Sequence, residues 1–185
     1  MMNDVAANVA VFLIYTLSTL YIAALMLRLL LALVRADFYN PLSQFIVTVT
    51  NPVVVPLRRV IPSVGGVDSA SVILIFALKL LELWLRIMIV GVAPTLPILI
   101  VVALLELIEL LIHIFIFALI VQAAISWIAP AQAFGNPAVS ILQDLTQPLL
   151  RPVRRVLPPV GMVDLSPLVV IIGLYVLLII LRSLH

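Results

Sequence analysis

The sequence predicts an all-α integral membrane protein with four transmembrane helices, arranged as two tandem parallel repeats. Of its 185 residues, 65% are hydrophobic and only 10% are charged, and the mean hydropathy of +1.38 lies outside the range of a soluble domain. Crossing a hydrocarbon core of about 30 Å takes roughly 18–20 apolar residues. Four segments are long enough, at about 5–34, 69–90, 97–128 and 165–183.

An internal repeat is the second observation behind this fold class. Residues 51–68 read NPVVVPLRRVIPSVGGVD, and residues 147–164, which lie 96 positions later, read QPLLRPVRRVLPPVGMVD. Both contain the pattern P-x3-P-x-R-R-x-[IL]-P-x-x-G, which apolar composition alone does not produce. The chain is therefore predicted to be a tandem duplication. Its first copy is residues 1–92 and its second copy is residues 93–185.

Each copy is predicted to contain an amphipathic helix after its first transmembrane helix. Apolar residues recur at helical spacing from Phe38 and again from Phe134, which predicts helices at about 38–51 and 136–147. These helices are too short to span a bilayer, so we expect them in the membrane interface with Phe38 and Phe134 in lipid. A short helix packed on the bundle predicts the same periodicity and stays open as the alternative.

A segment rich in proline and arginine follows each amphipathic helix. Three prolines within eleven residues are predicted to prevent a regular helix and to hold the backbone extended, and glycine then permits a tight turn. An aspartate just before the next apolar run is predicted to cap that helix. The residues of this structural motif are Pro52, Pro56, Pro62, Gly65 and Asp68 in the first copy, and Pro148, Pro152, Pro158, Gly161 and Asp164 in the second.

The arginines of this segment are the candidate binding residues. In the simpler interpretation they only fix topology and bind anionic headgroups, at roughly 1 kcal/mol for each basic residue. A topology signal needs no proline, however, and a fixed backbone that presents guanidiniums suits a defined lipid phosphate or protein carboxylate. The candidates for binding a partner or lipid are Arg58, Arg59, Arg151, Arg154 and Arg155.

A second group of ionisable residues lies within the two middle apolar segments. Folding these segments into a hairpin about Pro94 brings Lys79 beside Glu109 and Arg86 within a turn of Glu106. We interpret the group as intramembrane ion pairs that lock the hairpin, and a proton relay or metal site is the alternative. The residues concerned are Lys79, Glu82, Arg86, Glu106, Glu109 and His113.

The distribution of arginine predicts the orientation in the membrane. Both arginine segments lie between apolar runs, whereas the connection at 91–97 carries no charge. The positive-inside rule therefore places the arginine loops in the cytoplasm and both termini on the opposite side. The N-terminal MMND lacks the basic region of a secretory signal, so we expect the first apolar run to be retained.

The whole arrangement resembles the YggT family of bacterial integral membrane proteins. The resemblance covers about residues 20–90 and 115–183, and is carried by FYNPLSQF, TNPVVVPLRRVIPSVGG, ISW, TQPLLRPVRRVLPPVG and DLSPL. It implies a multi-pass protein of the bacterial inner membrane, so the termini, which the positive-inside rule places opposite the cytoplasm, are expected in the periplasm. It also implies a link to cell division, envelope organisation or osmotic stress, and in organellar relatives to assembly of a photosynthetic cytochrome complex. The second copy departs from the first at Met162, where the first has Gly66.

These observations favour a non-enzymatic assembly or scaffolding factor over an enzyme. The signatures H-E-x-x-H, G-x-S-x-G and the P-loop are absent, and no cofactor, metal or nucleic acid is expected. We expect the duplicated arginine segments to dock anionic lipid or a membrane or cytoplasmic protein. The alternative is an ion transporter or channel component linked to osmotic tolerance. It would use Glu106, Glu109 and His113 and, with few spans, would require a homo-oligomer.

Overall fold

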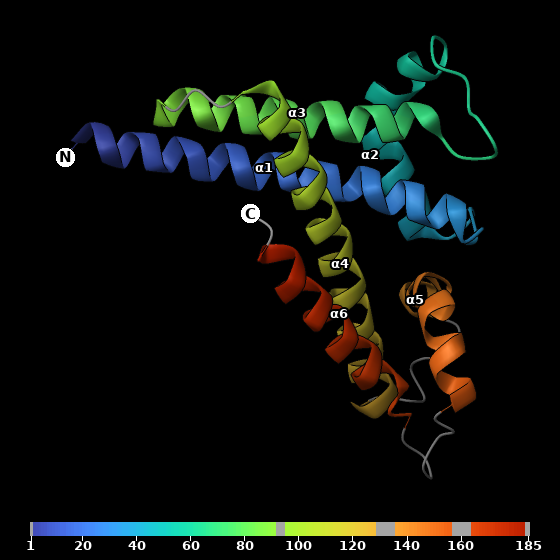
Figure 1. Ribbon diagram of the computed structural model, residues 1–185. Helices are drawn as coiled ribbons and strands as arrows, with labels where there is room; N and C mark the ends of the chain where they lie inside the picture. The colour runs from blue at the N-terminus through green and yellow to red at the C-terminus, as the bar shows by residue number, and fades with distance from the viewer. Residues whose placement is uncertain (1, 92–94, 129–135, 157–163, 184–185) are drawn as a thin grey trace. The chain divides into compact units, whose positions relative to one another are not determined.

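The computed structural model describes residues 2–91, 95–128, 136–156 and 164–183 (Figure 1). The named secondary-structure elements in this part of the chain are all α-helices, which confirms the all-α prediction. The predicted features at Pro94, Phe134, Pro158, Gly161 and Met162 lie outside the described residues. The helices are α1 (Met2–Leu33), α2 (Pro41–Arg58), α3 (Ser69–Val90), α4 (Leu96–Ile128), α5 (Pro137–Val156) and α6 (Ser166–Arg182).

Two helices are long and apolar enough to cross a membrane. They are α1 over Val5–Leu33, with a mean hydropathy of 2.1, and α4 over Leu96–Ser126, with a mean hydropathy of 2.7. Large apolar side chains such as Phe12 and Phe117 are 64% and 68% exposed, as suits a surface in contact with lipid. The helix α6 is also apolar but has 17 residues, and α3 carries three charged residues, Lys79, Glu82 and Arg86.

The chain packs as two compact units, which are described separately. Unit 1 consists of Met1–Leu29 and Val49–Leu110, and unit 2 consists of Leu30–Thr48 and Leu111–His185. Each unit therefore draws on both copies of the sequence repeat, and the division does not fall near residue 92.

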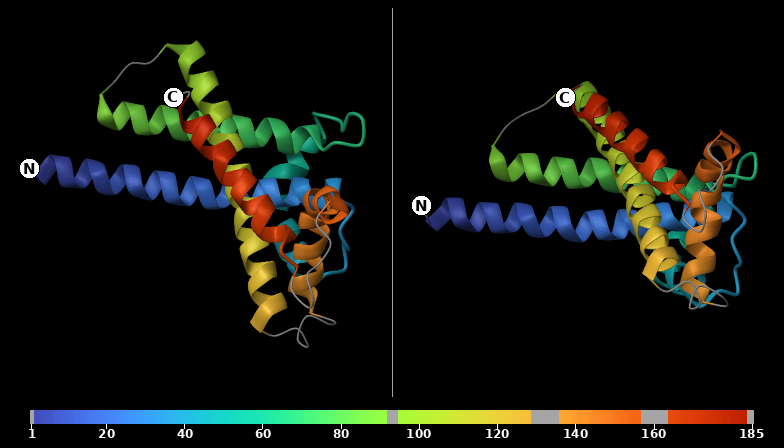
Figure 2. Two further views of the ribbon diagram at one scale, coloured as in Figure 1. Left: turned by 60° about the horizontal axis from the view of Figure 1, so that its bottom comes forward. Right: turned by 90° about the horizontal axis from the view of Figure 1, so that it is seen from below.

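In unit 1, α3 runs beside α1 in every view (Figure 2). The buried apolar side chains here include Ile22 and Leu25 of α1 and Leu83 of α3, while most of the remaining surface of α1 is apolar and exposed. Arg28 and Lys79 are buried in this unit and bond to other polar side chains, as described below. Unit 1 thus combines a narrow apolar core with buried polar contacts.

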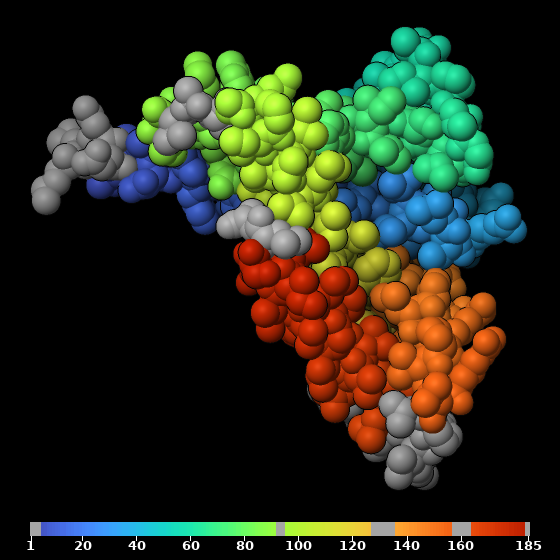
Figure 3. Space-filling model, viewed as in Figure 1, coloured from blue at the N-terminus to red at the C-terminus, as the bar shows by residue number. Residues whose placement is uncertain are grey.

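In unit 2, α6 packs against both α4 and α5. Ile112 and Ile116 of α4 form a buried cluster with Leu174 and Leu178 of α6. The side chains of α5 and α6 are also in contact, as the space-filling view shows (Figure 3). Apolar side chains thus join α4 to α6, and α5 lies against α6.

Asparagine begins each of the amphipathic helices, one residue before a proline at the first helical position. Asn40 Oδ1 accepts a hydrogen bond from the amide of Leu42, and Asn136 Oδ1 accepts one from the amide of Ala138. These bonds satisfy amides that have no partner within the helix. Asn40 Nδ2 also donates to the carbonyl of Pro137 at 2.7 Å, so the starts of α2 and α5 meet in unit 2.

The structure corrects the prediction of an extended backbone at the first two prolines of each segment. The helix α2 continues through Pro52 and Pro56 to Arg58, and α5 continues through Pro148 and Pro152 to Val156. The predicted helix ends near residues 51 and 147 were therefore wrong.

The spacing of the prolines explains why a helix tolerates them. The two prolines in each helix are four residues apart, so they share one face, and all four of them are exposed. The carbonyls that lose an amide partner lie on that outer face, where water or lipid headgroups can hydrogen-bond to them.

The predicted glycine turn is confirmed in the first copy. Gly65 and Gly66 have φ values of 62° and 80°, which side chains with a Cβ atom rarely adopt. They lie between Val64 and Val67, whose backbones exchange hydrogen bonds of 3.2 and 3.0 Å. The chain therefore reverses within two residues before Asp68, as in a two-residue hairpin loop.

Candidate functional site

The two arginines of each pair have different surroundings. Arg58 donates from Nε to Asp68 Oδ1 at 3.1 Å and from Nη2 to Asp68 Oδ2 at 2.6 Å. In the second copy Arg154 donates from Nε and Nη2 to Asp164 Oδ2, at 2.9 and 2.7 Å. In both copies the first arginine thus ties the end of an amphipathic helix to the start of the next helix.

Both aspartates are held in the ionised form that this tie requires. Partial burial of Asp68 favours the neutral acid, but hydrogen bonds from Arg58 and the Ser71 hydroxyl outweigh it and lower the pKa of the carboxyl. Burial likewise opposes the ionisation of Asp164, and the amide of Ser166 together with Arg154 still lowers its pKa. The carboxylates are therefore charged at neutral pH, and each ion pair is complete.

The predicted capping role differs between the two copies. Asp164 Oδ1 accepts a hydrogen bond of 2.9 Å from the amide of Ser166, the first residue of α6. Asp68 occupies the corresponding position before α3 but makes no side-chain cap there, and it instead accepts from Arg58 and from the Ser71 hydroxyl. Arg58 bonds to both oxygens of Asp68, whereas Arg154 bonds to Oδ2 of Asp164 alone and leaves Oδ1 for the amide.

The second arginine of each pair is presented outward. Arg59 and Arg155 are exposed, and within the described part of the chain neither guanidinium takes part in an ion pair. The neighbouring residues Val60 and Val156 are each 79% exposed. Arg151 is also exposed and donates to Gln147 Oε1 at 3.0 Å. The predicted binding residues therefore divide into tied arginines and outward-facing arginines.

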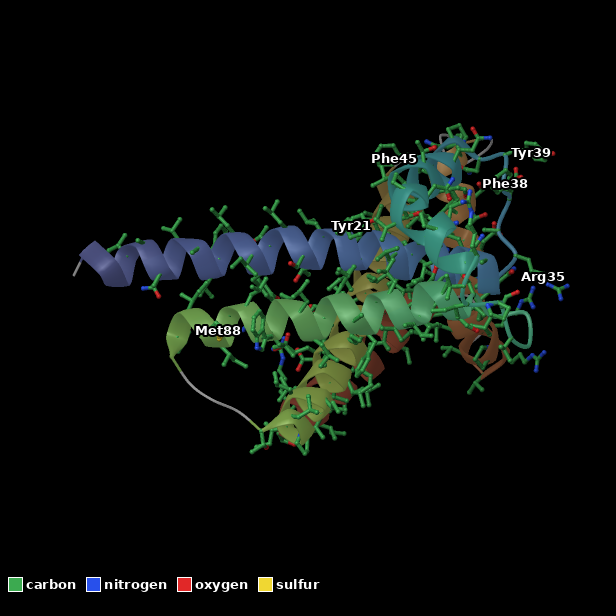
Figure 4. The ribbon with its side chains drawn as sticks, turned by 90° about the horizontal axis from the view of Figure 1, so that it is seen from above. Tyr21, Arg35, Phe38, Tyr39, Phe45 and Met88 are labelled. Atoms are coloured by element: carbon green, nitrogen blue, oxygen red, sulfur yellow. The ribbon has the colours of Figure 1, made fainter. Side chains whose placement is uncertain are left out.

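Aromatic side chains surround the start of α2 near another exposed arginine. Phe38, Tyr39 and Phe45 are 60%, 82% and 66% exposed. Figure 4 shows Phe38, Tyr39 and Arg35 pointing outward at the same end of the molecule. Aromatic rings of this kind are typical of the boundary between lipid and water. The position of Phe38 in lipid stays a prediction.

A buried polar contact joins each long helix to the amphipathic helix that follows it, and sequence reasoning missed it. Arg28 is only 8% exposed and donates from Nη1 to Thr50 Oγ1 at 2.7 Å and to Asn51 Oδ1 at 2.9 Å. In the second copy the Thr146 hydroxyl donates to Gln122 Oε1. The available signal was an arginine inside an apolar run, together with a threonine repeated at the 96-residue offset.

The charged residues of α3 and Glu106 of α4 form one network in unit 1. Lys79 Nζ lies 2.6 Å from Glu82 Oε2 and 2.5 Å from Glu106 Oε2. Arg86 Nη1 lies 3.0 Å from Glu82 Oε1 and 3.5 Å from Glu106 Oε1. The Tyr15 ring on α1 faces both cations, with its centroid 5.7 Å from Lys79 Nζ and 5.3 Å from Arg86 Cζ. Two cations and two carboxylates thus balance one another.

This network supports the interpretation of ion pairs and changes their register. The sequence register placed Lys79 beside Glu109, whereas the carboxylate of α4 at 2.5 Å from its ammonium belongs to Glu106. Glu106 therefore serves both cations of α3. Among the described residues, no group of three or more His, Cys, Asp or Glu side chains could hold a metal ion.

Comparison with known protein families matches the chain in two segments. The model of the CCB3/YggT family matches residues 7–89 and, separately, residues 101–185. The chain belongs to the CCB3/YggT family. The two matches cover the tied arginine, the outward-facing arginine and the aspartate in each copy.

Relatives in this family match along most of their length. "Uncharacterized protein YggT" of Escherichia coli K12 is 39% identical over 170 residues, which cover 92% of this chain and 87% of the relative. "Uncharacterized protein PA0392" of Pseudomonas aeruginosa is 40% identical over 167 residues, covering 89% and 84%. A Vibrio alginolyticus protein, "Uncharacterized protein in proC 3'region", is 41% identical over 165 residues, covering 88% of each chain. No solved structure matches.

Proposed function

We propose that this protein is a non-enzymatic assembly or scaffolding factor that docks an acidic partner through Arg59 and Arg155. The observation that carries the proposal is that the two arginines of each pair differ in their contacts. Arg58 and Arg154 are satisfied by aspartates of the same copy, whereas their neighbours are exposed. A guanidinium that is exposed on a fixed backbone is suited to paired hydrogen bonds with a carboxylate or phosphate.

The tie to aspartate supports docking because it limits motion of the neighbouring residue. Arg59 directly follows Arg58, which is bonded through two nitrogens to Asp68. Binding of a partner to Arg59 then costs this chain little backbone entropy, because the backbone at Arg59 is already restricted. A signal that only sets topology would need the charge but not this restriction.

The membrane arrangement that suits this role has four spans in the bacterial inner membrane. The helices α1, α3, α4 and α6 would cross, α2 and α5 would lie in the cytoplasmic interface, and both termini would be periplasmic. Support comes from the apolar surfaces of α1 and α4, from the paired charges on α3, and from the separate family match in each half. Both outward-facing arginines would then meet the cytoplasm at the height of the headgroups.

Photo-crosslinking in native membranes tests the proposal. A photoreactive residue at Val60 or Val156 lies beside an outward-facing arginine, and both positions are 79% exposed. We expect a discrete protein adduct that disappears in the Arg59→Ala, Arg155→Ala double variant while the amount of protein in the membrane stays the same. Arg35→Ala, which removes another exposed arginine, is the matched control and should keep the adduct.

Two results would contradict docking of a protein. One is the capture of lipid alone at both positions, and the other is an adduct that survives loss of both arginines. Arg58→Ala distinguishes the structural arginine from the docking arginine. It breaks the ion pair with Asp68 and should therefore lower the thermal stability of the protein.

No observation specifically favours the transport alternative. Glu106, which a transport pathway would use, is bonded to both Lys79 and Arg86 in the network described above. Ion flux through liposomes that contain the purified protein would revive that alternative.

A further inference from the structure

A polar pocket lies in unit 2 beside the second amphipathic helix. Its volume is about 260 Å³, and its walls come from α4 and from one face of α5. The residues on α5 follow the spacing i, i+4, i+7 and i+11, which keeps them on a single helical face. The lining residues are Gln122 on α4 and Gln143, Gln147, Leu150 and Arg154 on α5.

The polar lining is a property of the second copy alone. At the matching positions, 96 residues earlier, the first copy has Met26, Val47, Asn51, Val54 and Arg58. Three carboxamides of the second copy therefore correspond to one carboxamide and two apolar side chains in the first.

In the first copy the corresponding polar side chains on α2 are bonded within the chain. There the buried Arg28 donates to Thr50 and Asn51, so a guanidinium of the protein satisfies the polar groups. The residue that matches Arg28 in the second copy is Ala124, which has no group to place there. The second copy thus has both a pocket and the polar groups around it.

The atoms already bonded indicate which kind of ligand the pocket would take. Gln147 Oε1 accepts from Arg151, so Gln147 turns its carbonyl oxygen to the protein and retains amide N–H donors for another group. The Gln122 amide lies against the Thr146 hydroxyl, which also donates to the Leu142 carbonyl at 2.7 Å. Arg154 uses Nε and Nη2 for Asp164, and adds a further nitrogen donor to the lining.

The lining offers hydrogen-bond donors rather than a net charge. Its charged residue, Arg154, is paired with Asp164. Arg151, bonded to Gln147, and Asp144 both lie on α5 outside the lining and carry opposite charges. The choice of ligand therefore rests on the nitrogen donors, and a group that accepts several hydrogen bonds, such as a phosphate, matches this lining best.

We propose that this pocket binds a phosphate group, either in the headgroup of an anionic phospholipid or as free phosphate. The volume is below the range of about 300–1,000 Å³ that holds drug-sized ligands, which fits a headgroup better than a large cofactor. The site is distinct from the docking arginines, because Arg59 and Arg155 do not line it. The proposal therefore stands or falls independently of the proposed function.

Gln143 is the position at which to test the pocket, because it is exposed at the wall and no hydrogen bond described above depends on its side chain. Gln143→Val introduces the residue of the first copy, and Gln143→Glu places a negative charge there with little change in size. Gln44→Val is the matched control, since Gln44 is an exposed glutamine on α2, outside the pocket.

Native mass spectrometry of the full-length protein in detergent measures binding of dioleoyl phosphatidic acid, with dioleoyl phosphatidylcholine as the comparison lipid. We expect phosphatidic acid to bind more tightly than phosphatidylcholine. Both Gln143 variants should weaken that binding by about tenfold or more, the loss expected for a hydrogen bond to a charged group. The Gln44 variant should bind as the parent does.

Inorganic phosphate distinguishes the two sources of the phosphate group. Competition by millimolar phosphate against the lipid would support a site for free phosphate, and its failure to compete would support a lipid site. Equal binding of the two lipids, or undiminished binding by Gln143→Glu, would overturn the proposal. Circular dichroism of each variant establishes that the helices are retained.

Discussion

Lys79→Met is the substitution that most directly tests the ion network of α3 and α4. Lys79 Nζ is within 2.6 Å of carboxylates on both Glu82 and Glu106, and the exposed fractions of the Lys79 and Glu82 side chains are 5% and 0%. Removing the ammonium leaves two carboxylates facing Arg86 alone. The network then carries one uncompensated negative charge in a site with little access to water.

The cost of this change follows from that imbalance. Breaking one side of a buried ion pair costs about 3–5 kcal/mol, and the 22% exposure of Glu106 places the expected loss near the lower end, at about 3 kcal/mol. Adding Glu106→Gln removes the excess charge and leaves Glu82 with Arg86 at 3.0 Å. The double variant should therefore be more stable than Lys79→Met alone, with a coupling of about 2 kcal/mol.

The measurement is reversible unfolding by sodium dodecyl sulfate in mixed micelles, followed by circular dichroism, for the parent, both single variants and the double variant. As a control, Lys79→Met combined with Gln44→Ala on α2 should show additive losses, because Gln44 takes no part in the network. Additive losses for Lys79→Met and Glu106→Gln would refute the reasoning, since two residues in one ion network must be coupled.

Two further predictions concern the polar contacts at the helix ends. Thr50→Val should cost about 1.5–3 kcal/mol because it deprives a buried guanidinium of an acceptor, whereas Thr146→Val should cost about 0.5–1.5 kcal/mol because its partner is a neutral amide. The same unfolding assay checks this order, and equal losses would contradict it. The lowered pKa values of Asp68 and Asp164 mean that the arginine ties stabilise the protein above about pH 4 and are lost as the pH falls through the folded-state pKa. Thermal unfolding between pH 3 and 8 checks this window, and a loss that begins near pH 6 would assign it to other groups.

Much of the architecture could be predicted from the sequence because it depends on local composition. The apolar runs predicted α1, α3, α4 and α6 within a few residues, and the glycine pair predicted the turn before Asp68. The prediction at the prolines was wrong because the free-energy cost of a proline inside a helix depends on the surroundings of the carbonyl that loses its amide partner. On an exposed face, as at Pro52 and Pro56, that carbonyl finds another partner and the helix continues.

The candidate site was less predictable because it depends on which side chains meet. Arg58 and Arg59 are adjacent and chemically identical, and only the position of Asp68 ties one and leaves the other exposed. The pairing of Lys79 with Glu106 required the actual register of two helices, which differs by about one helical turn from the symmetric hairpin.

The sequence by itself determined an all-helical protein with a duplicated arginine motif, because hydrophobicity, helical periodicity and repetition are properties of residues close together in the chain. The tertiary structure decided which arginine is available, where Arg28 finds its acceptors, and why the second copy has a polar pocket where the first has a guanidinium. The physical reason is that hydrogen bonds and ion pairs act over about 3 Å. Their partners therefore depend on how distant segments pack, which the pattern along the chain does not specify.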